Sequence, residues 1–207
     1  MYKKMMRIKT MRLGPIMTNV YLIFDDEKKE AIIVDPAENA DYIADRISEN
    51  GLTPVAIFLT HGHGDHIGAV NGLVKKYGLK VYAHKDEAQM LGNPAFNLSN
   101  DFGNGVSIKP DVLLNDGDEL DIAGFKIKVI HTPGHTPGGC CYYFEDEKVL
   151  MSGDTMFCCS YGRTDFPGGS AKQLAESLQK LLTLPDDVQV YPGHDSQTCI
   201  GDERKWY

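Results

Sequence analysis

The segment THGHGDH at residues 60–66 constrains this chain more than any other feature of its sequence. It places three imidazoles and one carboxylate within six residues, directly after an apolar run at residues 55–59. Imidazole nitrogen and carboxylate oxygen are ligands for zinc, iron(II) and manganese, and the intervening glycines let the backbone turn tightly enough for the side chains to converge. Open α/β sheets carry their chemistry at the carboxyl ends of strands. The segment therefore predicts a metal site at the edge of a sheet.

Three later segments repeat this design, each an apolar strand followed by a glycine and then a potential ligand. They occupy residues 129–135, 149–154 and 188–194 and end in His135, Asp154 and His194. The glycine permits a sharp turn that exposes the next side chain. Together the four segments hold six of the seven histidines, a concentration that ordinary core and loop histidines do not explain.

Seven candidate ligands suit two metal ions better than one, because a mononuclear catalytic zinc needs only three protein ligands and an open position. We expect two divalent ions, zinc in the first place, with iron or manganese as alternatives. The first ion takes three imidazoles: His61, His63 and His135. The second takes one carboxylate and two imidazoles: Asp65, His66 and His194. Asp154 bridges the two ions, because a carboxylate has two oxygens.

The order of the predicted elements indicates two similar halves. In the first half, strands are expected at residues 6–13, 20–24, 31–35, 55–59 and 81–83, helices over 40–47 and 67–77, and one or two helical turns over 85–91. After an irregular surface loop at residues 92–112, a candidate lid, the second half has strands near 119–122, 125–130, 140–144, 148–151 and 188–191 and a helix from Ser170. Strands followed by a helix, twice, predict an αββα sandwich in one domain over residues 1–207, with two mixed β-sheets and helices on the outer faces.

Charge and composition narrow the classes of molecule that this protein is expected to bind. A net charge of −8 argues against nucleic acid, since phosphate backbones need clustered Lys and Arg. No apolar run approaches the roughly 20 residues of a membrane span, and the basic opening segment lacks the apolar core of a signal peptide. We expect a cytoplasmic protein without nucleic-acid or membrane partners, and the sequence leaves its oligomeric state open.

Five cysteines without CxxC spacing fit reduced thiols. Cys140 and Cys141 are expected to be buried small side chains, while the role of Cys158 and Cys159 stays open. Three other polar residues have structural interpretations. His131 is expected to orient the turn before His135, and His84 to be structural. Asp35 is either a turn residue before Pro36 or a hydrogen-bond partner of a ligand histidine.

Four motifs in this order resemble the metallo-β-lactamase superfamily: THGHGDH at 60–66, GHT at 134–136, SGDTMF at 152–157 and YPGH at 191–194. Within that superfamily, GDT and PGH resemble glyoxalase II, the hydroxyacylglutathione hydrolases. The resemblance runs from about residue 18 to the end of the chain. It implies the four-layer αββα fold, a dinuclear centre and the ligand division given above.

The resemblance implies hydrolysis of a small-molecule thioester by a metal-bridging hydroxide, which Asp65 orients while binding its ion. A thiolate leaves with little help from a general acid, because the pKa of a thiol is only about 8.5. In glyoxalase II a cationic residue at the place of Arg163 binds a glutathione carboxylate. Arg163 is expected either to do so, with Tyr161 beside it, or to pair with Asp165.

The chain also departs from the long enzymes of that family. Asp195 and Ser196 stand where those enzymes carry a tyrosine that contacts glutathione, and no C-terminal helical domain follows before Tyr207. The chain therefore resembles the short, single-domain bacterial members, and the thiol carrier stays open.

Other activities on the same fold are alternatives. Residues 162–166 and 191–195 also resemble persulfide dioxygenases, in which His61, His135 and Asp154 would form an iron-binding facial triad. A lactonase is a further alternative, because the same metal set suits a cyclic ester. Hydrolysis of antibiotics is less favoured, because dinuclear β-lactamases do not use a bridging aspartate like Asp154.

Overall fold

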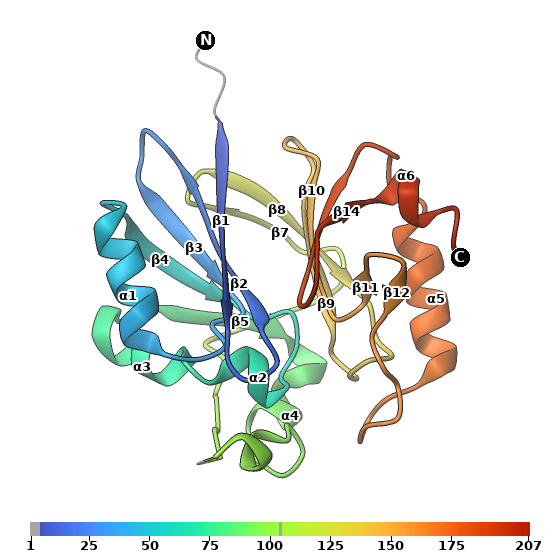
Figure 1. Ribbon diagram of the computed structural model, residues 1–207, viewed down its shortest axis with the longest axis horizontal. Coiled ribbons are helices and arrows are strands. Elements are labelled where there is room, and N and C mark those ends of the chain that lie inside the picture. The colour runs from blue at the N-terminus through green and yellow to red at the C-terminus, as the bar shows by residue number, and fades with distance from the viewer. Residues whose placement is uncertain (1–4, 104) are drawn as a thin grey trace.

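The computed structural model describes residues 5–103 and 105–207 and contains two six-stranded sheets packed face to face (Figure 1). The first sheet has the strand order β1 (Met6–Leu13), β2 (Thr18–Asp25), β3 (Glu30–Val34), β4 (Thr53–Phe58), β5 (Lys80–His84) and β6 (Val112–Leu114). The second has the order β14 (Thr198–Cys199), β13 (Gln189–Pro192), β10 (Val149–Gly153), β9 (Cys140–Phe144), β8 (Phe125–His131) and β7 (Glu119–Ile122).

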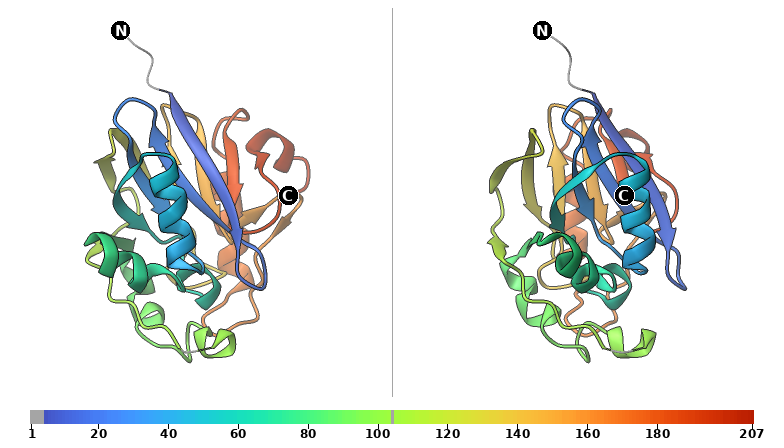
Figure 2. Two further views of the ribbon diagram at one scale, coloured as in Figure 1. Left: turned by 60° about the vertical axis from the view of Figure 1, so that its left-hand side comes forward. Right: turned by 90° about the vertical axis from the view of Figure 1, so that its left-hand side faces the viewer.

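Helices cover both outer faces of this pair of sheets. Helices α1 (Ala40–Glu49) and α3 (Val70–Tyr77) lie on the first sheet, and α5 (Ala171–Leu181) lies on the second (Figures 1 and 2). The predicted αββα sandwich is therefore confirmed. In the part of the chain that the structure describes, no helix has the length and apolar character needed to cross a bilayer.

The alternation of side chains along the strands explains the layers. In β2, Val20 and Leu22 point to the helices on the first sheet, while Tyr21 and Ile23 face the second sheet. All eight residues of β2 are buried, as expected for a strand covered on both faces. A third core forms where the apolar stripe of α5, which includes Leu178, packs on the outer face of the second sheet.

The strand directions bring all the predicted ligand segments to one edge. Strands β3, β4 and β5 are parallel, as are β10 and β13. Strand β8 runs in the same direction as β10, because both are antiparallel to β9. The segments that follow β8, β10 and β13 therefore begin at the same edge of the second sheet, and the contact of His63 with His135 places the segment after β4 beside them.

The helix predicted over residues 67–77 is wrong in extent. The structure has a short helix α2 (Gly64–Ile67) and then α3, with a break at residues 68 and 69. A Cβ atom at Gly68 would lie 2.3 Å from the Ala37 carbonyl oxygen, so the close approach of two backbones decides this break. Because α2 is separate, it can point His66 at the metal cluster independently of α3.

The segment predicted as a surface loop at 92–112 is partly buried. It contains the 3-10 helix η2 (Ser99–Phe102), and Asn97 is fully buried. The Gly64 N–H donates to the Asn97 carbonyl at 2.7 Å, which ties this segment to α2. The helical turns predicted at residues 85–91 are present as η1 (Lys85–Glu87) and α4 (Ala88–Leu91). Further short elements not predicted are β11 (Met156–Phe157), β12 (Ser160–Tyr161) and α6 (Ile200–Glu203), together with β6 and β14.

Candidate metal centre

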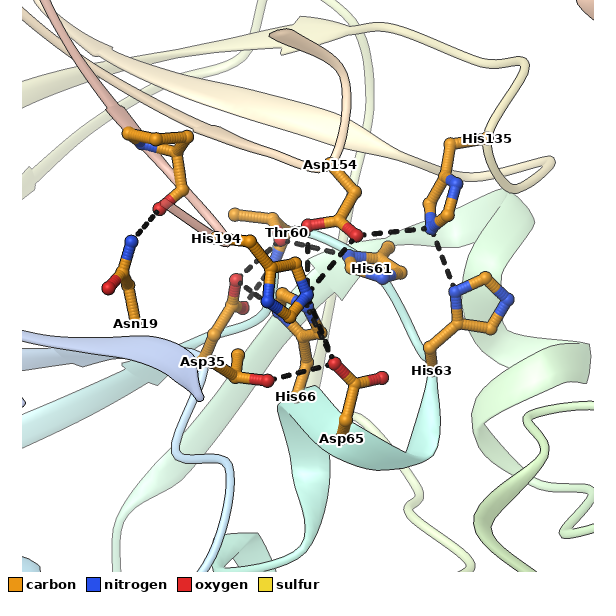
Figure 3. A network of polar contacts seen from close by, with 12 residues as sticks. Asn19, Asp35, Thr60, His61, His63, Asp65, His66, His135, Asp154 and His194 are labelled. Atoms are coloured by element: carbon orange, nitrogen blue, oxygen red, sulfur yellow. Dashed lines mark hydrogen bonds and ion pairs between the residues drawn. The ribbon is translucent and has the colours of Figure 1, made fainter. Parts of the chain in front are cut away.

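The structure brings all seven predicted ligand residues together at the common edge of the two sheets (Figure 3). Residues 61–66 come from the turn after β4 and from α2, and the other three follow β8, β10 and β13. Five of the seven side chains are buried and the remaining two are half-buried. The full set is His61, His63, Asp65, His66, His135, Asp154 and His194.

Three imidazoles form a first cluster. His63 Nδ1 lies 2.9 Å from His135 Nε2. The ring of His61 is 4.9 Å from that of His63 and 4.8 Å from that of His135, measured between centroids. One nitrogen of each ring lies within 4.8 Å of the other two, so a single cation could contact all three.

A carboxylate and two imidazoles form a second cluster. His66 Nε2 and His194 Nε2 each lie 3.3 Å from Asp65 Oδ2. The two Nε2 atoms are 3.4 Å apart. This cluster combines the nitrogen and oxygen donors that zinc, iron and manganese accept.

Asp154 stands between the two clusters (Figure 3). Its Oδ2 atom lies 3.5 Å from His135 Nε2 and 3.5 Å from His194 Nε2, while Oδ1 lies 3.4 Å from His66 Nε2. One carboxylate thus faces donors of both clusters, which is the arrangement needed to join two cations.

Unpartnered polar atoms show that these residues fit bound cations. Three of the buried side-chain atoms without a hydrogen-bond partner in the described chain are His61 Nε2, His63 Nε2 and Asp154 Oδ1. A buried polar atom without a partner is destabilising and rare. All three lie within the two clusters, where cations would satisfy them.

The pKa directions also favour metal binding. Burial and the neighbouring histidines hold the pKa of His61 well below its usual value, and burial with His135 lowers the pKa of His63 to about 3. Burial raises the pKa of Asp65, but the charges on His66 and His194 outweigh burial and lower it. Neutral imidazoles and ionised carboxylates are the forms that bind metal.

His66 behaves differently. Burial lowers its pKa, but Asp65 and Asp154 outweigh burial and raise the pKa well above the usual value. In the metal-free protein, a proton on His66 therefore supplies positive charge between two carboxylates. A bound cation would supply positive charge at the same place and displace that proton.

Asp35 and Thr60 support the cluster from behind. Asp35 Oδ1 accepts from the Thr60 N–H at 2.7 Å, and Oδ2 accepts from the Thr60 hydroxyl at 2.6 Å. Asp35 Oδ2 also lies 3.0 Å from His66 Nδ1. Of the two interpretations of Asp35 given above, the structure bears out the hydrogen bond to a predicted ligand histidine.

Two supporting residues had no signal in the sequence. The Thr18 hydroxyl donates to Asp65 Oδ2 at 2.9 Å, from a residue 47 positions earlier in the chain. Glu87 is buried and accepts from the Gly62 N–H through Oε1 and from the Gly138 N–H through Oε2, both at 2.7 Å. It thereby connects the turn after β4 to the turn that contains His135.

The histidines outside the predicted ligand set lie elsewhere. The rings of His84 and His131 stack with centroids 3.9 Å apart and an interplanar angle of 10°. His131 Nε2 lies 3.0 Å from the Pro137 carbonyl oxygen. This contact spans the turn that contains His135. Cys140 and Cys141 are buried, as predicted.

A cavity of about 580 Å³ opens over the metal cluster. Tyr161 and Arg163 line its rim, and Tyr161 is 56% exposed. The Arg163 guanidinium makes two hydrogen bonds of 2.7 Å to the Asp165 carboxylate and lies 3.9 Å from the centroid of the Phe166 ring. Of the two interpretations of Arg163, the internal ion pair is therefore present, and the side chain still borders the cavity.

Comparison with known proteins agrees with this geometry. The family model for the metallo-beta-lactamase superfamily matches residues 13–194. This chain belongs to the metallo-beta-lactamase superfamily. Members of the superfamily are typically hydrolytic metalloenzymes, and their fold binds divalent metals.

Two curated relatives match nearly the whole chain. The probable metallo-hydrolase YqgX of Bacillus subtilis is 40% identical over 96% of this chain and 95% of its own length. The hydroxyacylglutathione hydrolase GloC of Haemophilus influenzae is 37% identical over 97% of this chain and 96% of its own length.

Solved structures show the same fold. BLEG-1, described as a B3 metallo-beta-lactamase, superposes with a TM-score of 0.91 at 41% identity, covering 96% of this chain and 97% of its own. TTHA1623, in a di-iron-bound form, has a TM-score of 0.86 at 34% identity over 96% and 98%. ETHE1 from Myxococcus xanthus has a TM-score of 0.80 at 31% identity over 97% and 82%.

Proposed function

We propose that this protein is a dinuclear metal-dependent hydrolase of small-molecule thioesters of the hydroxyacyl-glutathione type. The observation that carries the proposal is the position of Asp154, whose carboxylate faces donor atoms of two separate ligand clusters. The similarity to GloC over almost the full length of both chains supports the substrate class.

In this proposal each cluster holds one divalent ion, zinc in the first place, with iron or manganese as alternatives. The first ion has three histidine ligands: His61, His63 and His135. The second has one carboxylate and two histidines: Asp65, His66 and His194. Asp154 joins the two. When bound, such ions supply a nucleophilic hydroxide at neutral pH and polarise the acyl carbonyl of the substrate.

Asp65 has the additional role of orienting the nucleophile. It lines the cavity, and the Thr18 hydroxyl fixes one of its oxygens at 2.9 Å. Its lowered pKa keeps the carboxylate ionised at neutral pH, so Asp65 accepts a hydrogen bond from the attacking water and is too weak a base to remove its proton. Asp65 therefore holds the attacking oxygen in a defined direction over the cavity floor.

A thioester substrate suits a cavity whose lining histidines are all predicted metal ligands. Among the described residues, the histidines that line it are His63, His135 and His194, and all three belong to the ligand clusters. No lining histidine is then left to protonate a leaving group. A thiolate does not need this help, because the pKa of a thiol is only about 8.5.

Arg163 and Tyr161 are the proposed substrate contacts at the rim. The Arg163 side chain is exposed, and its pair with Asp165 keeps the guanidinium beside the cavity. A carboxylate of the substrate would compete with Asp165 for the same fork of N–H donors. Arg163→Gln should then raise KM for a carboxylate-bearing thioester about tenfold, with kcat little changed. Lys172→Gln on the exposed face of α5 is the matched control.

The direct test is a hydrolysis screen with lactoylglutathione, other thioesters and lactones, using protein of measured metal content. Thioester hydrolysis with two ions per chain is the expected result. His63→Ala should abolish it while the circular dichroism spectrum stays that of the native fold. His84→Asn, which changes a histidine outside the clusters, should keep the activity. Near-native turnover by His63→Ala would contradict the proposed site.

The second candidate is a mononuclear iron persulfide dioxygenase, with which the similarity to ETHE1 is consistent. In that case His61, His135 and Asp154 would hold one iron, and the second cluster would stay without a metal. One iron per chain, together with oxygen consumption on glutathione persulfide, would replace the hydrolase proposal. Turnover of lactones without thioesters would make the protein a lactonase instead.

A further inference from the structure

Two adjacent cysteines lie at the tip of the β11–β12 hairpin, outside the metal clusters. Cys158 and Cys159 are both exposed, and their Sγ atoms are 3.9 Å apart. The Glu203 carboxylate lies beside them, so that one ligand atom from each of the three residues falls within 4.8 Å of the others. We propose that Cys158, Cys159 and Glu203 form a second cation site, selective for thiophilic divalent ions of the zinc and cadmium class.

The separation of the two sulfurs matches chelation of a single ion. Zinc–sulfur bonds are about 2.3 Å long, so two sulfurs on a tetrahedral ion stand about 3.8 Å apart. The observed 3.9 Å therefore needs almost no adjustment of either side chain. Thiolate is also the ligand that most favours soft cations over magnesium or calcium.

The third ligand is held in place by the fold. Glu203 is fully buried and lies in α6, 44 residues after Cys159. Its Oε2 atom accepts from the Cys159 N–H at 2.9 Å, and Oε1 accepts from the Thr198 hydroxyl at 2.6 Å. Each carboxylate oxygen has a second lone pair for a cation. The site would therefore join the hairpin to the C-terminal segment.

A disulfide between the same two residues is geometrically disfavoured. Every described peptide bond is trans, and consecutive Cα atoms across a trans peptide are only about 3.8 Å apart. Disulfides span about 4.4–6.8 Å between Cα atoms. Chelation leaves the two sulfurs about 3.8 Å apart and does not require the Cα atoms to be more widely separated. The geometry therefore favours a bound ion over an S–S bond.

The acid–base state of Cys159 makes it a weak nucleophile and makes cation binding depend on pH, because the thiolate is the metal ligand. Desolvation, the Cys158 thiol and the nearby Glu203 raise the pKa of Cys159. This thiol is then protonated at neutral pH and is a weak nucleophile. When a thiophilic cation binds, each S–H bond is replaced by a bond from sulfur to the metal, and the proton passes to the solvent.

Occupation of this site would affect the rim of the cavity. Phe157 and Tyr161 flank the two cysteines in the hairpin, and both line the cavity. An ion that ties the hairpin tip to Glu203 would hold these two side chains in fixed positions. The proposal does not depend on the hydrolase activity, because none of its ligands belongs to the two clusters.

The test is a titration with cadmium of protein brought to two zinc ions per chain, in a phosphine reductant, which does not compete as a dithiol would. The readout is the near-ultraviolet thiolate-to-cadmium charge-transfer band. The clusters of histidines and aspartates contain no sulfur, so cadmium bound there gives no such band. One equivalent of cadmium should produce the band in the wild-type protein.

Three variants make the assignment specific. Cys158→Ser and Cys159→Ser should each weaken cadmium binding at least tenfold, and the double variant should lose the band. Cys199→Ser should leave the band unchanged, since the Cys199 thiol donates to Asp202 Oδ2. Glu203→Gln should weaken binding while the band persists. Absence of the band in the wild type, its survival in the double serine variant, or its loss in Cys199→Ser would overturn the proposal.

Discussion

Asp35 Oδ2 lies 3.0 Å from His66 Nδ1, and the opposite nitrogen of that ring lies 3.3 Å from Asp65 Oδ2. The buried carboxylate thus fixes the direction of His66, so that Nε2 faces the cluster, and with a cation on Nε2 it would keep the remaining proton on Nδ1. Asp35→Asn keeps the shape of the side chain but removes the charge and presents an amide in its place.

For Asp35→Asn we expect metal affinity to fall about 10- to 100-fold, the usual effect of losing such a partner. Competition with a chromogenic chelator measures this directly. Asp41→Asn on the exposed side of α1 is the matched control and should bind metal like the wild type. If Asp35→Asn retained metal equally well, Asp35 would have no part in positioning His66.

Gly193 allows the last ligand segment to pass close to the cluster. A Cβ atom at this position would lie 2.1 Å from Asp154 Oδ1 and 2.7 Å from His66 Cε1. Gly193→Ala should therefore displace Asp154 or His66 and lower metal content and turnover at least tenfold. At Gly92 an added Cβ would meet its nearest neighbour at 3.4 Å, so Gly92→Ala is a fair control. Equal metal content in both variants would contradict this prediction.

Removal of metal should lower stability, because the clusters leave buried donor atoms without hydrogen-bond partners. Binding of an ion to the native state alone contributes about 4 kcal/mol when its concentration is 1,000 times Kd. For a chain of this size, that corresponds to a fall in Tm of about 8–16 °C after chelation. Scanning calorimetry of chelated and reloaded samples measures the change. An unchanged Tm would show that the ions contribute nothing to the fold.

His84 predicts a pH dependence away from the metal clusters. Burial and the stacked His131 ring lower the pKa of His84 to about 4. Between pH 6.5 and about 4 the unfolded chain binds a proton at this position and the folded chain does not. The free energy of unfolding should therefore fall as the pH is lowered through this range.

His84→Asn isolates this effect, because an asparagine oxygen can replace His84 Nδ1 as acceptor for the Asp86 N–H. Between pH 7 and pH 4 the wild type should lose about 1–2 kcal/mol more than the variant, allowing for solvent screening. Urea unfolding at both pH values measures the difference. His131→Gln, which removes the stacked ring, should reduce the wild-type loss. A pH dependence identical in wild type and His84→Asn would rule out this role.

The clustering of the predicted ligands could be anticipated because they follow apolar strands within a few residues. In the sequence, glycines separate His61, His63 and Asp65 from one another. This local pattern can be recognised without knowledge of the fold. Thr18 and Glu87 were not anticipated, because their partners lie 47 and 25 or 51 residues away and no local pattern marks such contacts.

The short length of several strands explains most of the remaining differences between the predicted and the observed secondary structure. Strands β11, β12 and β14 have two residues each and β6 has three, too few to show alternation. The separation of α2 from α3 depends on the close approach of Gly68 to Ala37, which joins distant parts of the chain. The single domain over residues 1–207 and the cytoplasmic location stay predictions.

The contact of Glu87 with Gly62 and Gly138 has a consequence for how the protein matures. These two glycines belong to turns from different sheets, so the carboxylate can accept hydrogen bonds from both only after the sheets have packed together. The first sheet is complete at Leu114, before the chain reaches His135, Asp154 and His194. A nascent chain therefore lacks the complete set of proposed metal ligands until its final strands are in place. Under the proposed function, the two ions would bind at the end of folding and would stabilise the finished sandwich rather than guide its assembly.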